Sequence, residues 1–303
     1  MKIKLLLLTF CLCFITIEVV AQAVQVRTER DVQGDILFNA EAQELGSYTL
    51  ALELSDVKGY KSFSGPNLRF ILSSGYEDSF FRLEKEDRGP YSYKYKYRSY
   101  LGRYNAKPDV DYPYILPTLL GDGIKVDALV IGKKALSNNP KDNKVGGFTF
   151  YYPNGQDTVH AIRSGKVVMI KEGNPEMYIQ ENKDKKVVYD SKHSHRGLWI
   201  EHNDGTIAQY TCLSRGSSLV QMNDRVLVGQ PIIAFKSGEN QSLLALIVSY
   251  LDRDLERVYL SPIFCTSQGL INLNFREKYI STYSPDIIKK ELSKKEKKRK
   301  SWD

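Results

Sequence analysis

The strict alternation of tyrosine with polar residues from Tyr91 to Tyr100 constrains the fold of this chain more than any other feature. Tyr91, Tyr93, Tyr95 and Tyr97 would share one face of an extended strand, and the residues between them would share the other. A tyrosine face beside a basic face is able to bind sugars or polyanions. The same pattern is more typical of an ordinary half-buried strand, and we prefer that interpretation.

This strand belongs to a longer β-rich stretch. Gly46 to Leu54 also alternates, and Asn67 to Leu72 predicts a further strand. We therefore expect residues 24–111 to form an all-β domain, a β-sandwich. The connection to a second domain is marked by three prolines: Pro108, Pro113 and Pro117.

The second half of the chain is also punctuated by turn residues. Asn203-Asp204-Gly205 lies between two β-rich runs and is a tight-turn signal, because Asp-Gly tolerates the positive φ angles that two-residue hairpin turns require. Asn223 is suited to a left-handed backbone. Short segments of this kind without helical periodicity predict a mainly antiparallel sheet.

Three blocks in a fixed order carry a family pattern: Phe148 to Val168, Trp199 to Ser214, and Val220 to Ile232. Together they resemble the M23 peptidase domain, also called LytM-like or lysostaphin-like, and we assign residues 112–282 to it. The resemblance implies a zinc-dependent β-sheet fold that cuts peptidoglycan cross-bridges. Residues 24–111 are similar to the β-sandwich domain that precedes this module in some secreted bacterial proteins.

The positions that carry chemistry in that family hold other residues here. The resemblance places the zinc-binding Asp at Thr149, a catalytic His at Cys212, and a His-x-His pair at Leu244 and Leu246. The first zinc-binding His would fall between Asn138 and Val145, where the chain has no histidine. Leucine has no lone pair for a metal, so we predict no zinc and no other cofactor.

The chain has four histidines: His160, His193, His195 and His202. His193 and His195 spell a His-x-His but lie among Lys and Arg, so we interpret them as part of a solvated loop. The resemblance suggests a structural role for His202 beside the hairpin. His160 lies between Val159 and Ala161 and should point away from their face, at the surface or at the edge of a groove.

Cys212 is the one substituted position with reactive potential. A thiolate acts as a nucleophile when a neighbouring group lowers its pKa, and no His near Cys212 in the sequence would do so. We therefore interpret Cys212 as a small, partly buried side chain. Its one potential disulfide partner after removal of a leader would be Cys265, and the sequence does not decide whether that bond forms.

The two ends of the chain differ from the rest. Residues 1–23 have a basic start, an apolar run and an Ala-Gln-Ala ending, which predicts a signal peptide, with an uncleaved membrane anchor as the alternative. Residues 283–303 form a basic tail with an N-cap pattern, Ser284-Pro285-Asp286, that predicts a short helix. Because most of the net charge of +7 lies in this tail, nucleic acid is not an expected partner. The tail would either contact an anionic membrane surface or remain solvated without a dedicated partner.

These observations predict an exported, catalytically inactive M23-like protein of a bacterial periplasm or outer envelope. It would bind peptidoglycan or regulate another envelope protein through a groove lined by Tyr210, Cys212, Leu244, Leu246 and His160. Two alternatives remain open. One is an active peptidoglycan hydrolase, with relocated zinc ligands around His193, His195 and His202 or with Cys212 as the nucleophile, and the other is a purely structural envelope protein.

Overall fold

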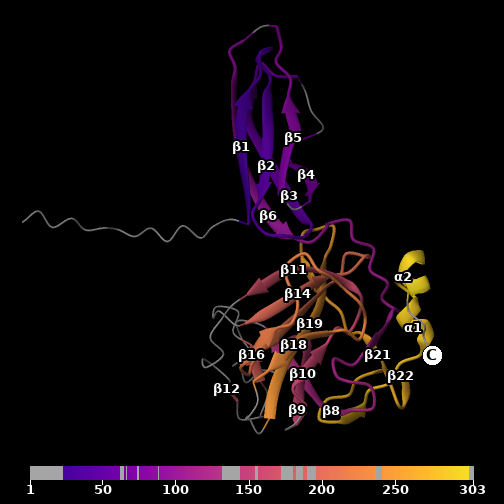
Figure 1. Cartoon of the computed structure of the whole chain (residues 1–303). Helices are drawn as coiled ribbons and strands as arrows, with labels where there is room; N and C mark the ends of the chain where they lie inside the picture. Colours follow the sequence, from indigo (N-terminus) through magenta and orange to yellow (C-terminus); the bar gives the residue numbers. More distant parts are fainter. Residues whose placement is uncertain are drawn as a thin grey trace, which may run out of the picture.

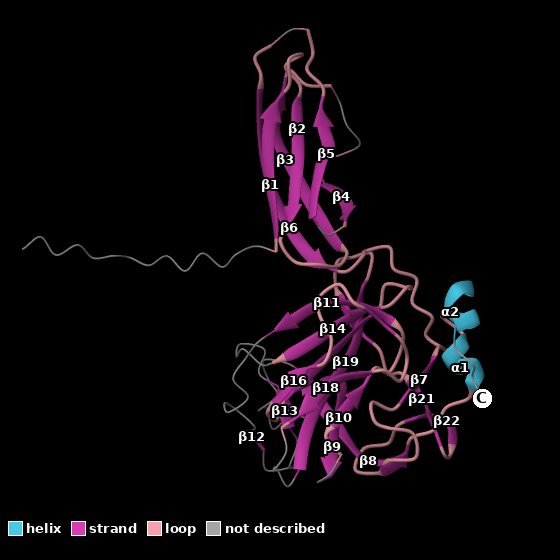
Figure 2. Ribbon diagram, viewed as in Figure 1, coloured by secondary structure: helices cyan, strands magenta, loops and turns pink. Residues whose placement is uncertain are grey.

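The computed structural model describes residues 23–61, 65, 67–73, 75–87, 89–131, 144–153, 156–171, 180–181, 187–189, 196–236 and 241–299. The described chain is all-β, with mainly antiparallel pairing, and carries two short helices near its C-terminal end (Figures 1 and 2). This confirms the predicted fold class. The predicted signal peptide up to Gln22, His193 and His195 lie outside the described residues. None of the helices in the described part of the chain is long and apolar enough to cross a membrane.

The first six strands pair only with one another. They are β1 (Val24–Arg30), β2 (Ile36–Ala42), β3 (Tyr48–Lys58), β4 (Asn67–Leu72), β5 (Gly75–Leu83) and β6 (Ser92–Leu101). Two three-stranded sheets, β1-β2-β5 and β4-β3-β6, enclose one apolar core, in which Phe38, Leu50 and Leu52 are almost completely buried (Figure 1). Residues 24–101 therefore form a sandwich of two sheets.

Three of the four alternating tyrosines, Tyr93, Tyr95 and Tyr97, lie on β6, and Tyr91 directly precedes this strand. Tyr93, Tyr95 and Tyr97 pack against the sandwich core, whereas the lysines and the arginine between them are exposed. The hydroxyl of Tyr93 lies 3.2 Å from Thr28 Oγ1, which joins the two sheets. The interpretation of this segment as an ordinary half-buried strand is confirmed.

The remaining strands build the second half of the chain. They are β7 (Pro113–Ile115), β8 (Gly123–Ile131), β9 (Lys144–Pro153), β10 (Thr158–His160), β11 (Gly165–Lys171), β12 (Gln180–Glu181), β13 (Val187–Tyr189), β14 (Gly197–Glu201), β15 (Ile207–Cys212), β16 (Gly216–Ser218), β17 (Arg225–Val226), β18 (Pro231–Phe235), β19 (Gln241–Leu251), β20 (Arg257–Tyr259), β21 (Ile263–Thr266), β22 (Gly269–Asn272) and β23 (Lys278–Ile280).

One large sheet organises these strands, in the order β12-β13-β8-β9-β19-β15-β14-β11-β17, with β20 on β19 and β23 on β8. Two small sheets, β10-β18-β16 and β22-β21-β7, complete this half. The main core includes the fully buried residues Phe150, Tyr152, Tyr210 and Phe264. Burial of this apolar surface is the main favourable contribution to the stability of the fold.

Local sequence signals match the observed turns. β14 and β15 form a hairpin in which the His202 N–H donates to Thr206 O and the Gly205 N–H donates to His202 O. Gly205 has a φ of +86° and Asn223 a φ of +76°, as expected of these residues in left-handed backbone. Three residues, 203 to 205, lie between the hydrogen-bonded pair His202 and Thr206, whereas the Asp-Gly pattern favours a turn of two residues. Of these three residues, Gly205 alone has a positive φ.

The C-terminal segment contains α1 (Pro285–Lys289) and α2 (Lys294–Arg299), two helices where the sequence predicted one. Ser284 caps α1 with its side chain, which accepts a hydrogen bond from the Ile287 N–H, and Pro285 follows at the first helical turn. Ile287 and Ile288 are buried against the body of the second half.

The two halves of the chain are joined by polar contacts around Glu201. Its carboxylate accepts a hydrogen bond of 2.9 Å from the Ser47 N–H and lies 3.6 Å from Arg103 Nε. A second link runs from Arg257 Nη2 to the carbonyl of Leu101, at 2.6 Å. These contacts hold the end of β14 against the base of the sandwich.

Candidate functional site

The positions at which the M23 resemblance places catalytic residues lie on three neighbouring strands of the large sheet. Thr149 is on β9, Leu244 and Leu246 are on β19, and Cys212 is at the end of β15. In the antiparallel register, Cys212 lies opposite Leu244 and Tyr210 lies opposite Leu246. The fold therefore brings these positions close together.

Four of the five predicted groove residues lie in the protein interior. Tyr210, Cys212, Leu244 and Leu246 have no exposed surface and belong to the main apolar core. The Tyr210 hydroxyl accepts a hydrogen bond of 2.9 Å from the Ile162 N–H within that core. The expectation that these residues line an open groove is therefore wrong, because residues of both small sheets, such as Phe235 and Phe264, pack with them in the same core.

Thr149 lies on the opposite face. It pairs with Ala245, whereas Leu244 pairs with Phe150 and Leu246 pairs with Phe148. Since successive side chains of a strand point to opposite faces, a site that includes position 149 would take its late pair from Leu243 and Ala245. The sequence placed the family's His-x-His pair at Leu244 and Leu246. The residues that share a face with Thr149 are each one position earlier, at Leu243 and Ala245.

The face that carries Thr149 is mainly apolar, although Asp127 lies opposite Thr149 on β8 and Thr211 lies opposite Ala245 on β15. Ala245 is fully buried in a small cluster with Leu129, Leu213 and Ile247, and Leu243 packs against it. The Thr149 hydroxyl is buried without a hydrogen-bond partner. Within the described part of the chain, neither face of the sheet therefore gathers the three or more His, Cys, Asp or Glu ligands that a zinc site needs.

Cys212 does not supply the missing chemistry. Burial raises the pKa of its thiol to about 12, so the thiol stays protonated at neutral pH. Cys212 and Cys265 are both buried and free, so the potential disulfide is not formed. Among the described residues, no group of three or more His, Cys, Asp or Glu side chains is arranged to hold a metal ion. The residues present do not fit the zinc site that the resemblance implies.

His202 has a structural environment, in agreement with the role that the resemblance suggests for it. Its ring Nδ1 lies 2.8 Å from the carbonyl of Ser164, and its Nε2 is buried without a partner. Burial and the nearby positive charge of Arg163 lower the pKa of His202 to about 4, so the imidazole is neutral at pH 7.

A buried ionic cluster, which sequence reasoning missed, lies beside His202. Arg163 donates to Asp204 Oδ2 at 2.8 Å and to Glu291 Oε1 at 2.6 Å, and its guanidinium lies 3.7 Å from the centre of the Tyr112 ring. Burial alone would raise the pKa of Asp204, but hydrogen bonds from Thr206 and the charge of Arg163 lower it to about 2. The available sequence signal was an arginine directly after the apolar pair Ala161-Ile162.

This cluster attaches the C-terminal segment to the body of the protein. Glu291 and Glu296 are the two acids within the lysine-rich run, and Glu296 binds Arg225 at 2.8 Å. Glu296 also accepts a hydrogen bond of 2.6 Å from the Ser293 N–H at the start of α2. The tail up to α2 is therefore docked by its acids, rather than fully solvated.

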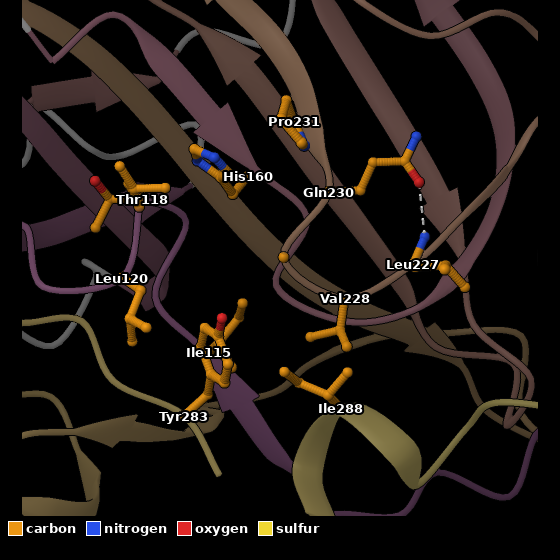
Figure 3. A pocket seen from close by; sticks show the side chains of 12 residues that line it. Ile115, Thr118, Leu120, His160, Leu227, Val228, Gln230, Pro231, Tyr283 and Ile288 are labelled. Atoms are coloured by element: carbon orange, nitrogen blue, oxygen red, sulfur yellow. Dashed lines mark hydrogen bonds between the residues drawn. The ribbon is translucent and has the colours of Figure 1, made fainter. Parts of the chain in front are cut away.

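His160 lines a separate pocket of about 490 Å³ (Figure 3). As predicted, Val159 and Ala161 point into the core while His160 points away from it, although His160 is itself buried. The other walls include Ile115, Val228, Tyr283 and Ile288, so α1 and the residue just before its N-cap close one side (Figure 3). Of the five predicted groove residues, His160 is the one that lines this pocket.

Comparison with known proteins finds no matching family model and no matching curated protein. Three solved structures are similar to the chain. A putative glycyl-glycine endopeptidase LytM from Ruminococcus gnavus has 16% identity and a TM-score of 0.29, with 50% of this chain and 57% of that chain covered. Csd3 from Helicobacter pylori has 10% identity and a TM-score of 0.31, with coverages of 88% and 73%. A zinc-containing peptidase from Vibrio cholerae has 14% identity and a TM-score of 0.31, with coverages of 78% and 77%.

Proposed function

We propose that this protein is an exported, non-catalytic binding module with an M23-like arrangement, which attaches to peptidoglycan or to another protein of the bacterial envelope. One observation carries the proposal: the positions that would form the zinc site hold Thr149, Cys212, Leu244 and Leu246, and all four are sealed from solvent. The alternative placement at Leu243 and Ala245 is equally apolar.

Physical chemistry explains how such a fold persists without a metal. Clustered carboxylate and imidazole groups are costly to bury unless a metal or partner compensates them. Leucine and alanine at these positions remove that cost and extend the apolar packing of the sheet. The substitutions therefore stabilise the scaffold while they remove the Lewis acid and the general base.

Neither form of the active-hydrolase alternative has a supporting observation. A cysteine nucleophile at position 212 would need a depressed thiol pKa, whereas burial raises it. Of the three histidines named for a relocated zinc site, His202 is the one within the described residues, and its Nδ1 contacts a backbone carbonyl in a fully buried setting.

The direct test is metal content together with activity on cell walls. We would purify the protein without a metal-affinity tag, measure bound zinc by mass spectrometry, and incubate the protein with isolated peptidoglycan sacculi. We expect less than about one-tenth of an equivalent of zinc, no release of wall fragments, and co-sedimentation with sacculi or with envelope proteins. One tightly held equivalent of zinc, or hydrolysis of the sacculi, would overturn the proposal.

A further inference from the structure

The pocket beside His160 is lined by none of Thr149, Cys212, Leu244 and Leu246, and it has the features of a ligand site. Its volume of about 490 Å³ falls in the range of small-molecule sites, which is roughly 300–1,000 Å³. Its walls come from four places in the sequence: the segment from Ile115 to Leu120, His160 on β10, the turn that carries Val228, and the C-terminal segment with Ile288 (Figure 3).

The lining is apolar with few polar groups. Thr118, His160, Gln230 and Tyr283 are the lining residues with polar side-chain atoms, and no Asp, Glu, Lys or Arg lines the pocket. Gln230 Oε1 already accepts a hydrogen bond of 3.1 Å from the Leu227 N–H (Figure 3). A charged ligand would lose its hydration here without gaining an opposite charge, so the pocket favours a neutral one.

His160 supplies a polar group that the fold leaves unused. His160 lines the pocket with a relative exposure of 6%, and its Nδ1 is sealed from solvent without a hydrogen-bond partner of normal geometry. A ligand that hydrogen-bonds the imidazole where it lines the pocket would offset the cost of desolvating this polar ring. Burial also lowers the pKa of His160, so the ring is neutral near pH 7 and can both donate and accept a hydrogen bond.

The entrance to the pocket is apolar as well. Leu119 and Leu120 line it and are 57% and 48% exposed. Their turn is held in place because the Gly121 N–H donates to the carbonyl of Ser281. Exposed leucines beside a concave apolar pocket are typical of binding sites, because a ligand removes their surface from water.

We propose that this pocket binds a small, uncharged, mainly apolar ligand with one hydrogen-bonding group, such as a phenolic ring, that contacts the imidazole of His160. The site does not depend on the proposed envelope function. Because Tyr283 and Ile288 form one wall, a bound ligand also holds the C-terminal segment against the body.

The experiment compares p-cresol with 4-methylbenzoate, which has a similar shape but a negative charge. We expect p-cresol to bind with a dissociation constant of about 1 mM or tighter and to shift the methyl NMR signals of Thr118, Val228 and Ile288. We expect 4-methylbenzoate to bind at least about tenfold more weakly. The proposal is overturned if p-cresol shifts none of these methyl signals at about 10 mM, or if the anion binds equally well.

Variants locate the ligand within the pocket. Leu227→Trp should fill the pocket and abolish p-cresol binding, and His160→Phe should weaken it about fivefold by removing the hydrogen bond. Leu270→Trp is the matched control, since Leu270 is 58% exposed and does not line the pocket. Retention of full affinity by Leu227→Trp would contradict the assignment. If Leu227→Trp does not fold, the methyl shifts of the unmodified protein and the His160→Phe affinity still decide the question.

Discussion

Thr149 lies directly opposite Ala245 on the neighbouring strand, and so its side chain is on the other face of the sheet from Leu244 and Leu246. Residues that would have to converge on one zinc ion are therefore divided between two faces of the sheet, with Leu244 and Leu246 in the main core and Thr149 on the face of Ala245. Restoring the family's residue types at the positions read from the sequence would not recreate a metal site, because the side chains would not point to a common centre.

The double substitution Leu244→His with Leu246→His tests this relationship. Both imidazoles would enter the main core without partners, so we expect the free energy of unfolding to fall by about 4 kcal/mol or more. We expect no zinc binding and no hydrolysis of sacculi. Urea unfolding and calorimetric zinc titration are the measurements, with Leu270→His at an exposed position as the control.

Recovery of wall hydrolysis in the double variant would show that the functional centre lies on the core face after all. The control should change the free energy of unfolding by less than about 0.5 kcal/mol, because Leu270 is largely exposed. A similar loss in both variants would mean that histidine itself, rather than its burial, destabilises the protein.

Cys212 offers a test of the cysteine-enzyme alternative. Its thiol is fully buried and its pKa is raised to about 12, so reaction with a thiol reagent at pH 8 should be at least about 100-fold slower in the native protein than in guanidinium chloride. The measurement uses a Cys265→Ser background with the N-terminal segment removed, so that Cys212 is the thiol observed. Rapid labelling of the native protein would support a reactive thiol.

The ion pair between Arg163 and Glu291 gives a prediction for the C-terminal segment. Glu291→Gln leaves a buried guanidinium with one carboxylate instead of two, and we expect a loss of roughly 2 kcal/mol in the free energy of unfolding. Trypsin should also cut faster after Lys289 and Lys290. Mass spectrometry of the digestion products measures this rate.

Glu84→Gln is the control for that experiment, since Glu84 pairs with Lys61 on the open surface of the first half. Exposed pairs contribute little, so trypsin cleavage at the C-terminal segment should be unchanged in this variant. If Glu291→Gln leaves cleavage unchanged as well, Arg163 is not what holds the segment in place.

The sequence predicted the local features of this protein better than its long-range ones. The Gly205 turn, the left-handed Asn223, the Ser284 cap and the outward direction of His160 each depend on a few neighbouring residues, and each is observed. Which residues of β9 and β19 share a face of the sheet depends on the register in which the two strands pair. A shift of one residue in that register moves every side chain of the strand to the opposite face. No local pattern encodes that register.

The ionic cluster was missed for a related reason. Arg163 and Glu291 are 128 residues apart, and their pairing exists only once the C-terminal segment has docked. In the sequence, Glu291 is one acid within a lysine-rich run, and such a run by itself predicts a solvated surface. The burial that makes the pair important is a property of the tertiary structure.

His202 gives a pH dependence whose sign follows from its burial. Its pKa is about 4 in the folded protein and about 6.5 when unfolded, so the unfolded chain binds the proton more readily between these values. The stability due to the neutral ring is fully present above pH 6.5 and is lost as the pH falls towards 4. Between pH 7 and pH 5 we expect a loss of about 2 kcal/mol from this group. Urea unfolding at both pH values should show a smaller loss in His202→Gln, and an equal loss in both proteins would assign the acid sensitivity to other groups.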